Sequence, residues 1–207
     1  MVEESGFFDS VNGDRVYPAD KFAKYFRKLV SDGVLYETGT DLQITAPETG
    51  MSVVINPGYA LIKGYWYDLS EPLTLPIEPA DATYDRIDRV ILRLDLNTDV
   101  RDIKARVLTG TPSDTPTPPA LTRTDNVYDL SLAQVYVKAG TGVIHSSDIT
   151  DERPNTDVCG FVKSRIDMVS FETWFKNSKT DFDEWYQSVQ NDVIDRKTAM
   201  KIALIFG

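Results

Sequence analysis

The stretch that decides the fold is IDRVILRLDL, residues Ile87–Leu96. Most of its apolar residues recur at every second position, with charged residues interleaved between them: Ile87, Val90, Leu92, Leu94 and Leu96. A period of two places successive side chains on opposite faces of an extended chain, so the pattern predicts a β-strand. A second apolar segment, Ile103–Leu108, follows a polar link. We expect the two segments to form an antiparallel hairpin with a longer loop.

Short strand-like segments continue on both sides of this hairpin. They are rich in β-branched and aromatic residues and are bounded by Pro, Gly and Asn. They cover residues 42–45, 51–55, 59–62, 65–67, 73–77 and 130–137. The Pro-rich segment Gly110–Ala120 (GTPSDTPTPPA) interrupts them, and we expect an extended surface excursion of the same domain rather than a linker. The whole pattern predicts a mainly β fold, an antiparallel β-sandwich over residues 41–160.

Helical periodicity replaces this pattern near the N-terminus, within residues 1–40. Residues 19–30 predict a helix, with Pro18 and Asp20 suited to its first turn and Gly33 to its end. Its apolar residues share one face, which we term the N-terminal packing face: Phe22, Tyr25, Phe26 and Leu29. This face needs cover, either from the rest of the chain or from another subunit. Just before it, Asn12-Gly13 predicts a tight turn, since an EF-hand calcium loop would place Ala19 at the bidentate ligand position.

A second helix is predicted near the C-terminus, within residues 161–207. Residues from Phe171 onward follow alternating steps of four and three, the spacing of a coiled-coil seam, with large apolar side chains at every step except Ser178. The predicted interface residues are Phe171, Trp174, Phe175, Phe182, Trp185 and Val189. This stripe could dock on the chain's own sheet, but its size favours self-association, with a homotrimer preferred over a dimer. A last apolar segment, Ala199–Phe206, closes the chain.

Composition excludes several function classes. The formal net charge is −10 and the sequence pI is near 4.6, so we expect no nucleic-acid partner and no anionic membrane surface. The one cysteine, Cys159, excludes an internal disulfide and a Cys-cluster metal site, and we expect it to be buried. No apolar run reaches the length of a membrane span, and no secretory signal is recognisable, so synthesis in a cytoplasm is expected.

Catalytic patterns are missing from the sequence. His145 is the only histidine, beside Ser146 and Ser147 in a predicted loop, so histidine triads and multi-histidine zinc sites are excluded. No nucleophile elbow or phosphate loop is present. Nearby carboxylates are expected by chance in so acidic a chain, although a glycosidase pair is not excluded by sequence. We therefore expect no enzyme, no metal and no cofactor.

Three adjacent aromatic residues, Tyr65, Trp66 and Tyr67, suggest a second class of function. On a strand, Tyr65 and Tyr67 share one face and Trp66 takes the other. Packing is favoured for at least one face. The other could stack on a sugar ring, which leaves open a carbohydrate-binding module with a saccharide partner.

Taken in order, several segments resemble a group of baseplate proteins of long-tailed phages and prophages of Gram-positive bacteria. The segments are FFDSVNGDRVYPADKFAKYFRKLVSDGV, GMSVVINPGYALIKGYWY, ADATYDRIDRVILRLD, GTPSDTPTPPAL and SDITDERP. The set is similar to upper baseplate proteins and to the N-terminal modules of receptor-binding tail proteins, and it extends from about Phe7 to Trp185.

The resemblance implies a virion structural protein of the phage tail, made in the bacterial cytoplasm. Its N-terminal part and β domain would attach to other baseplate or tail proteins at the tail-tip hub, and its helical end would trimerise or carry an adsorption module. It offers no catalytic residues to transfer. Longer relatives continue into a receptor-binding domain, so we expect this chain to be an adaptor. The alternative is a receptor-binding module that recognises host cell-wall saccharide.

Overall fold

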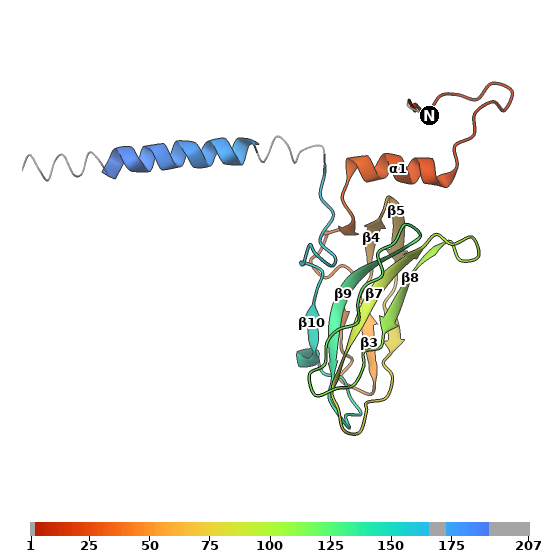
Figure 1. The fold of residues 1–207 in the computed structure, drawn as a ribbon, viewed down its shortest axis with the longest axis vertical. Coiled ribbons are helices and arrows are strands. Elements are labelled where there is room, and N and C mark those ends of the chain that lie inside the picture. The colour runs from red at the N-terminus through yellow and green to blue at the C-terminus, as the bar shows by residue number, and fades with distance from the viewer. Residues whose placement is uncertain (1–2, 166–172, 191–207) are drawn as a thin grey trace, which may run out of the picture. The chain divides into compact units, whose positions relative to one another are not determined.

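The computed structural model describes residues 3–165 and 173–190. The chain forms two compact units, Met1–Lys163 and Ser164–Gly207. The first unit holds helix α1 (Ala19–Leu29) and every strand of the described residues, and the second holds a helix over residues 173–190 (Figure 1). The predicted interface residue Phe171 and the apolar segment Ala199–Phe206 lie outside the described residues.

In the described part of the chain, the strands form three antiparallel sheets, with the orders β1-β4-β5, β2-β3-β6 and β10-β9-β7-β8. Apolar side chains from all three sheets pack into one shared core. The mainly β fold predicted from the sequence is thus confirmed. The strands are β1 (Gly33–Val34), β2 (Ile44–Thr45), β3 (Ser52–Ile55), β4 (Gly58–Ile62), β5 (Tyr65–Leu69), β6 (Leu73–Pro76), β7 (Arg86–Asp95), β8 (Asp102–Leu108), β9 (Val127–Val137) and β10 (Ile149–Asp151), with a 3₁₀ turn at Ser146–Asp148.

Strand β7 lies between β8 and β9 and is the most buried strand of the large sheet. It pairs with β8 in the register Leu94↔Ile103, which confirms the predicted hairpin. Val90, Leu92 and Leu94 point into the shared core. Its other face carries Arg89, which is buried as well. A central strand needs cover on both faces, so the charged residues of this strand must be paired rather than solvated.

The Pro-rich segment supplies part of that cover. Gly110 at its start donates its backbone N–H to Asp88 Oδ1 (2.8 Å), and Arg89 Nη1 donates to the carbonyl oxygen of Pro119 near its end (2.7 Å). Arg86 Nε donates to the same Asp88 oxygen (2.9 Å), and Arg89 Nε lies 3.2 Å from a carboxylate oxygen of Glu152. The segment contains no strand, as expected, but it is fastened to β7 through buried charges.

Helix α1 begins with Asp20 in its first turn and ends with Arg27 and Lys28 in its last, which suits the helix dipole. It lies over the tip of the β4–β5 hairpin (Figure 1). That tip is a two-residue turn with Lys63 at φ 51° and Gly64 at φ 80°, the positive angles that tight hairpins require. The residue of α1 that is buried is the small Ala23.

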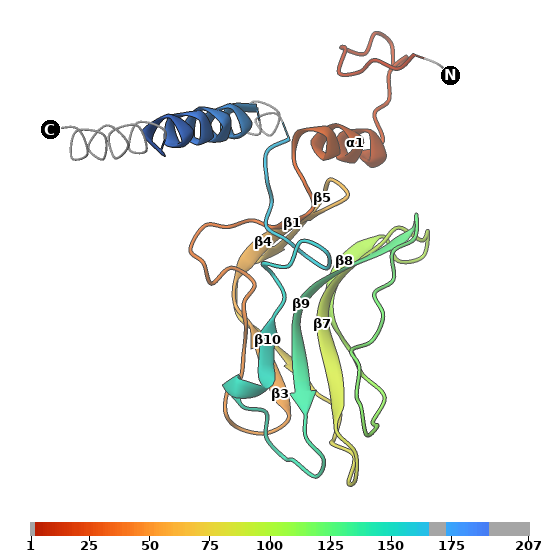
Figure 2. The same ribbon diagram turned by 60° about the vertical axis from the view of Figure 1, so that its left-hand side comes forward.

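The chain enters and leaves the β-sheets along neighbouring paths. Ser31 N donates to the carbonyl oxygen of Lys163 (2.9 Å), and Lys163 N donates to Ser31 Oγ (2.8 Å). Further along, Val34 N donates to Gly160 O (3.0 Å) and Val162 N to Val34 O (2.8 Å). Figure 2 shows β1, which follows α1, at the same end of the sheets as that helix. Both ends of the β-sheet region are therefore held together at one end of the unit.

Candidate functional site

Three places in the described chain present exposed aromatic side chains of interest, and the first is the helix over residues 173–190. Its predicted interface residues Trp174, Phe175, Phe182, Trp185 and Val189 are each between 40% and 60% exposed. At 3.6 residues per turn they fall within an arc of roughly 100° on one side of the helix. The predicted stripe is therefore an apolar face of the helix, interrupted at Ser178, while its pairing with other copies stays a prediction.

Two pairs of aromatic rings contact each other within this stripe. The ring of Phe182 lies 5.6 Å from that of Trp185 and 6.3 Å from that of Tyr186, the second pair stacked at 12°. Tyr186, itself 48% exposed, extends the stripe beyond the predicted interface residues. The three rings therefore form one aromatic cluster on the exposed side of the helix.

The second place is the N-terminal packing face of α1. Phe22, Tyr25 and Phe26 are nearly half exposed, and Leu29 is partly buried. Cover comes from Phe7, whose ring lies 5.4 Å from Phe22 and 5.1 Å from Tyr25 in an edge-to-face contact. The rest of the face stays open to a neighbour.

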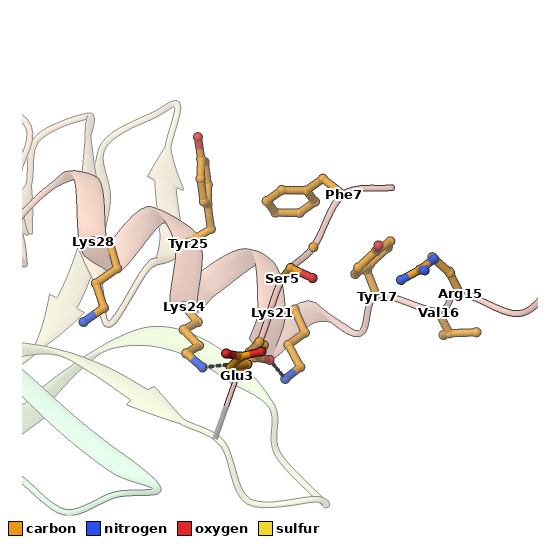
Figure 3. Close-up of a pocket in the computed structure, with 12 residues that line it drawn as sticks. Glu3, Ser5, Phe7, Arg15, Val16, Tyr17, Lys21, Lys24, Tyr25 and Lys28 are labelled. Atoms are coloured by element: carbon orange, nitrogen blue, oxygen red, sulfur yellow. Dashed lines mark hydrogen bonds and ion pairs between the residues drawn. The ribbon is translucent and has the colours of Figure 1, made fainter. Parts of the chain in front are cut away.

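A second strip runs beside this face on α1 and is cationic. Glu4, from the segment that precedes the helix, contacts both Lys21 and Lys24, and these two contacts lower the pKa of Glu4 to about 2. Figure 3 shows Phe7 beside Tyr25, with Lys21 and Lys24 along the same helix. A groove of about 530 Å³ lies between the N-terminal segment and α1. Sequence reasoning missed Glu4 and Phe7, since neither shares a periodic pattern with the helix.

The third place is the outer side of the β4–β5 hairpin. Trp66 is 65% exposed, whereas Tyr65 and Tyr67 pack against the core, which confirms the predicted alternation. The Trp66 ring lies nearly parallel to that of Tyr59, with the centroids 6.1 Å apart and an angle of 7° between the planes. Trp66 also borders a cleft of about 570 Å³.

The serine, histidine and cysteine side chains considered as catalytic candidates take part in structural contacts. Ser146 Oγ donates to Glu48 Oε1 (2.6 Å), and His145 Nδ1 lies 2.6 Å from Glu48 Oε2, so the carboxylate takes both side chains. The ring of His145 is exposed, yet it is bonded to Glu48 as well. Cys159 is buried, and burial, reinforced by the charge of Asp151, raises the pKa of its thiol to about 12. A thiol of this kind is not a nucleophile at neutral pH.

The described residues were also searched for metal-binding clusters and for membrane-spanning helices. Within residues 3–165 and 173–190, no three His, Cys, Asp or Glu side chains converge to hold a metal ion. None of the helices described there has the length and apolar character needed to cross a bilayer.

No protein-family profile matches the chain, and a search of curated proteins finds no match.

Proposed function

We propose that this protein is a non-catalytic assembly component that associates with itself through its C-terminal helix. The observation that carries the proposal is the aromatic stripe of Phe182, Trp185, Tyr186 and Val189 with its neighbours, exposed along one side of the helix. Fully burying one such side chain contributes about 1.5–3 kcal/mol, so several rings from each copy supply enough free energy for a stable complex. Aromatic anchors of this type commonly dominate binding energy at interfaces.

The proposed complex is a coiled-coil homotrimer. Heptad spacing favours supercoiling, in which a seam residue of one helix inserts between residues of the next. The stripe is widened by Tyr186 and by Trp174 beyond a strict seam. A wide stripe is covered better by two neighbouring helices than by one, which favours three copies over two.

The β unit would then act as a rigid scaffold. We propose that its sheets form a β-sandwich, a proposal supported by the single core to which all three sheets contribute. In this scheme the N-terminal packing face of Phe22, Tyr25, Phe26 and Leu29 docks on a neighbouring protein. The resemblance to phage baseplate proteins supports a place in the virion tail, as an oligomeric adaptor between the tail tip and the adsorption apparatus, in a protein made in the bacterial cytoplasm.

A non-catalytic role is supported by two side chains. The Ser146 hydroxyl donates to Glu48 rather than to a histidine nitrogen, so it is not activated as a nucleophile. The Cys159 thiol is buried with a raised pKa. Neither group is poised for covalent catalysis.

Light scattering on the full chain tests the assembly proposal. We expect a mass three times the 23.3 kDa of one chain, and we expect Trp185→Asp to lower it to the monomer mass because a carboxylate would be buried in the seam. Asp183→Ala, on the same helix but outside the aromatic stripe, is the matched control and should keep the trimer. Circular dichroism must show an intact helix and β unit in each variant. A 23.3 kDa wild-type monomer with a folded helix would refute the proposal.

A second candidate function is saccharide recognition, favoured by the outward, 65% exposed indole of Trp66. A flat apolar ring on the surface is suited to stacking against the C–H face of a sugar. A glycan array tests it: binding should be present for the wild type and absent for Trp66→Ala. This role is compatible with self-association, which would multiply the number of sites.

A further inference from the structure

The N-terminal segment over residues 3–8, which we term the strap, lies on α1 and contacts it at two points. At the first point, the carboxylate of Glu4 is shared between two lysines of the cationic strip. Its Oε1 pairs with Lys21 and its Oε2 with Lys24. Residues three apart on a helix lie on the same side of it. This strip of α1 therefore accepts a carboxylate that comes from outside the helix.

The second point of contact is aromatic. The ring of Phe7 lies edge-to-face on Tyr25 and tilted against Phe22, and it lies 5.7 Å from the ring of Tyr17 just before the helix. In the strap, Phe7 follows Glu4 by three positions. The strap thus shows which chemistry α1 accepts: a peptide segment with a carboxylate and, three residues later, an aromatic ring.

The strap is held weakly at both points. Glu4 and its two lysines are exposed to solvent, where ion pairs contribute little and are screened by salt. The ring of Phe7 is half exposed, and its backbone takes φ 65°, which is unfavourable for a side chain of this size. A segment with few buried contacts opens at low cost in free energy. Another segment that makes the same contacts could therefore replace it.

The strap also leaves part of α1 unoccupied. A groove of about 530 Å³ remains between them, and Lys28, one turn beyond Lys24, lines it (Figure 3). No ion pair of Lys28 is found among the described residues. Cations outnumber carboxylates along the groove, with Arg15, Lys21, Lys24 and Lys28 against Glu3 and Glu4. This charge is complementary to a ligand that is more acidic than the strap.

We propose that this face of α1 binds an acidic, aromatic peptide segment of a partner protein, and that the strap is an autoinhibitory segment which the partner displaces. The partner's carboxylates would pair with the cationic strip, including Lys28, and its ring would take the place of Phe7. Because the strap and the partner use the same contacts, they cannot bind together. The inference rests on the docking of the N-terminal packing face proposed above, and it names the chemistry of the partner and the control of that docking.

Fluorescence anisotropy on the full chain tests this site. The probe is a fluorescein-labelled peptide, EESGFFDS, which has the carboxylate and the ring at the required spacing. In the opened chain, Glu4→Ala and Phe7→Ala together release the strap. We expect the opened chain to bind the peptide at least about tenfold more tightly than the wild type, in which the strap competes for the site. Adding Lys21→Glu and Lys24→Glu to the opened chain should weaken binding by at least about tenfold, since like charges would meet.

Arg27→Glu is the matched control. It reverses the charge of an exposed residue of the same helix that does not line the groove. Added to the opened chain, it should leave the affinity within about twofold, because exposed charges away from the contact are screened. Peptides with alanine in place of both phenylalanines, or glutamine in place of both glutamates, should each bind more weakly. Circular dichroism must show the same helix and strand content in every variant.

Equal affinity of the opened chain and the wild type would refute the autoinhibitory strap. Equal effects of Arg27→Glu and of the two lysine reversals would refute the site, and no binding of the peptide to the opened chain would refute the inference as a whole. Light scattering distinguishes a second copy as the occupant. A Trp185→Asp chain that still associates, and becomes a monomer only when Glu4→Ala and Phe7→Ala are added, would assign the face to that copy and overturn a separate partner. Peptide binding is measured whether or not the wild type is a trimer, so its failure is distinct from failure of the assembly proposal.

Discussion

Gly64, at the tip of the β4–β5 hairpin, faces the carbonyl group of Ala23 in α1 with no room for a Cβ between them. A side chain at position 64 would overlap that oxygen, and the φ of 80° is one that side chains rarely adopt. We therefore expect Gly64→Ala to destabilise the docking of α1 by about 1–3 kcal/mol, through overpacking and backbone strain. Hydrogen exchange of the α1 amides would report it as lost protection.

Gly142→Ala is the matched control for that substitution. Nothing lies within 4 Å of a Cβ at position 142, and its backbone is not in the left-handed region. This variant should keep the exchange rates of α1 unchanged. Equal protection of α1 in the Gly64 and Gly142 variants would contradict the packing described here.

A buried carboxylate holds the start of the Pro-rich segment. Asp88 accepts from Arg86 Nε and from Gly110 N, and it is fully buried. Asp88→Ala would leave the guanidinium of Arg86 buried without a counter-charge, so we expect a loss of about 3–5 kcal/mol in the free energy of unfolding. Urea denaturation measures it. Asp114→Asn, an exposed change in the same segment, should stay within about 0.5 kcal/mol of the wild type, and a similar small effect for Asp88→Ala would count against the ion pair.

Stability should depend on pH through Glu48. The hydroxyl of Ser146, the ring of His145 and the backbone N–H of Ser146 lower the pKa of this carboxyl from 4.5 to about 2. Because the folded-state pKa is depressed, the carboxylate stabilises the fold above pH 4.5, and this contribution is lost as the pH falls toward 2. Glu48→Gln should therefore be less stable than the wild type at pH 7 and equal to it near pH 2.

Thermal unfolding of both proteins from pH 7 to pH 2 provides the measurement. Glu71→Gln, an exposed substitution in the β5–β6 loop, is the control and should follow the wild type throughout. A difference between Glu48→Gln and the wild type that stayed constant over this range would show that the charge of Glu48 plays no part.

The thiol of Cys159 should be inert in the folded protein. With a pKa raised to about 12 by burial, it is neutral at pH 8 and shielded from reagents. We expect no reaction with a thiol-specific disulfide reagent at pH 8 until denaturant is added, and then one thiol per chain. Rapid modification before unfolding would mean that the region around Cys159 opens in solution.

Features governed by neighbouring residues could be predicted from the sequence. The period of two in Ile87–Leu96 located β7, and the polar link after it located the turn to β8. Asn12 and Gly13 take positive φ, and Asp14 N donates to Val11 O at 3.3 Å, as the predicted turn requires. These signals survive because tertiary packing reinforces the local preference.

Features that join distant segments could not be predicted. The charges of β7 resemble a solvated face until residues such as Pro119 and Glu152 are brought over them. Ala23 is buried on α1 because Gly64 lies opposite, and no periodic pattern connects those positions. The cleft likewise needs α1, β5 and β8 together. A single sequence shows which side chains each segment carries. Which other residues they contact depends on how distant segments pair in the folded chain.

The hydrogen bonds that join Ser31 to Lys163 and Val34 to Gly160 make residues 35–159 a closed cassette. Its two ends are already adjacent. Another domain whose termini lie side by side could therefore replace it, and the distance between Ser31 and Lys163 would stay the same. Recombination could exchange such a cassette while leaving the flanking helical segments intact. The same geometry gives protein engineers two fixed splice points for grafting a different binding domain.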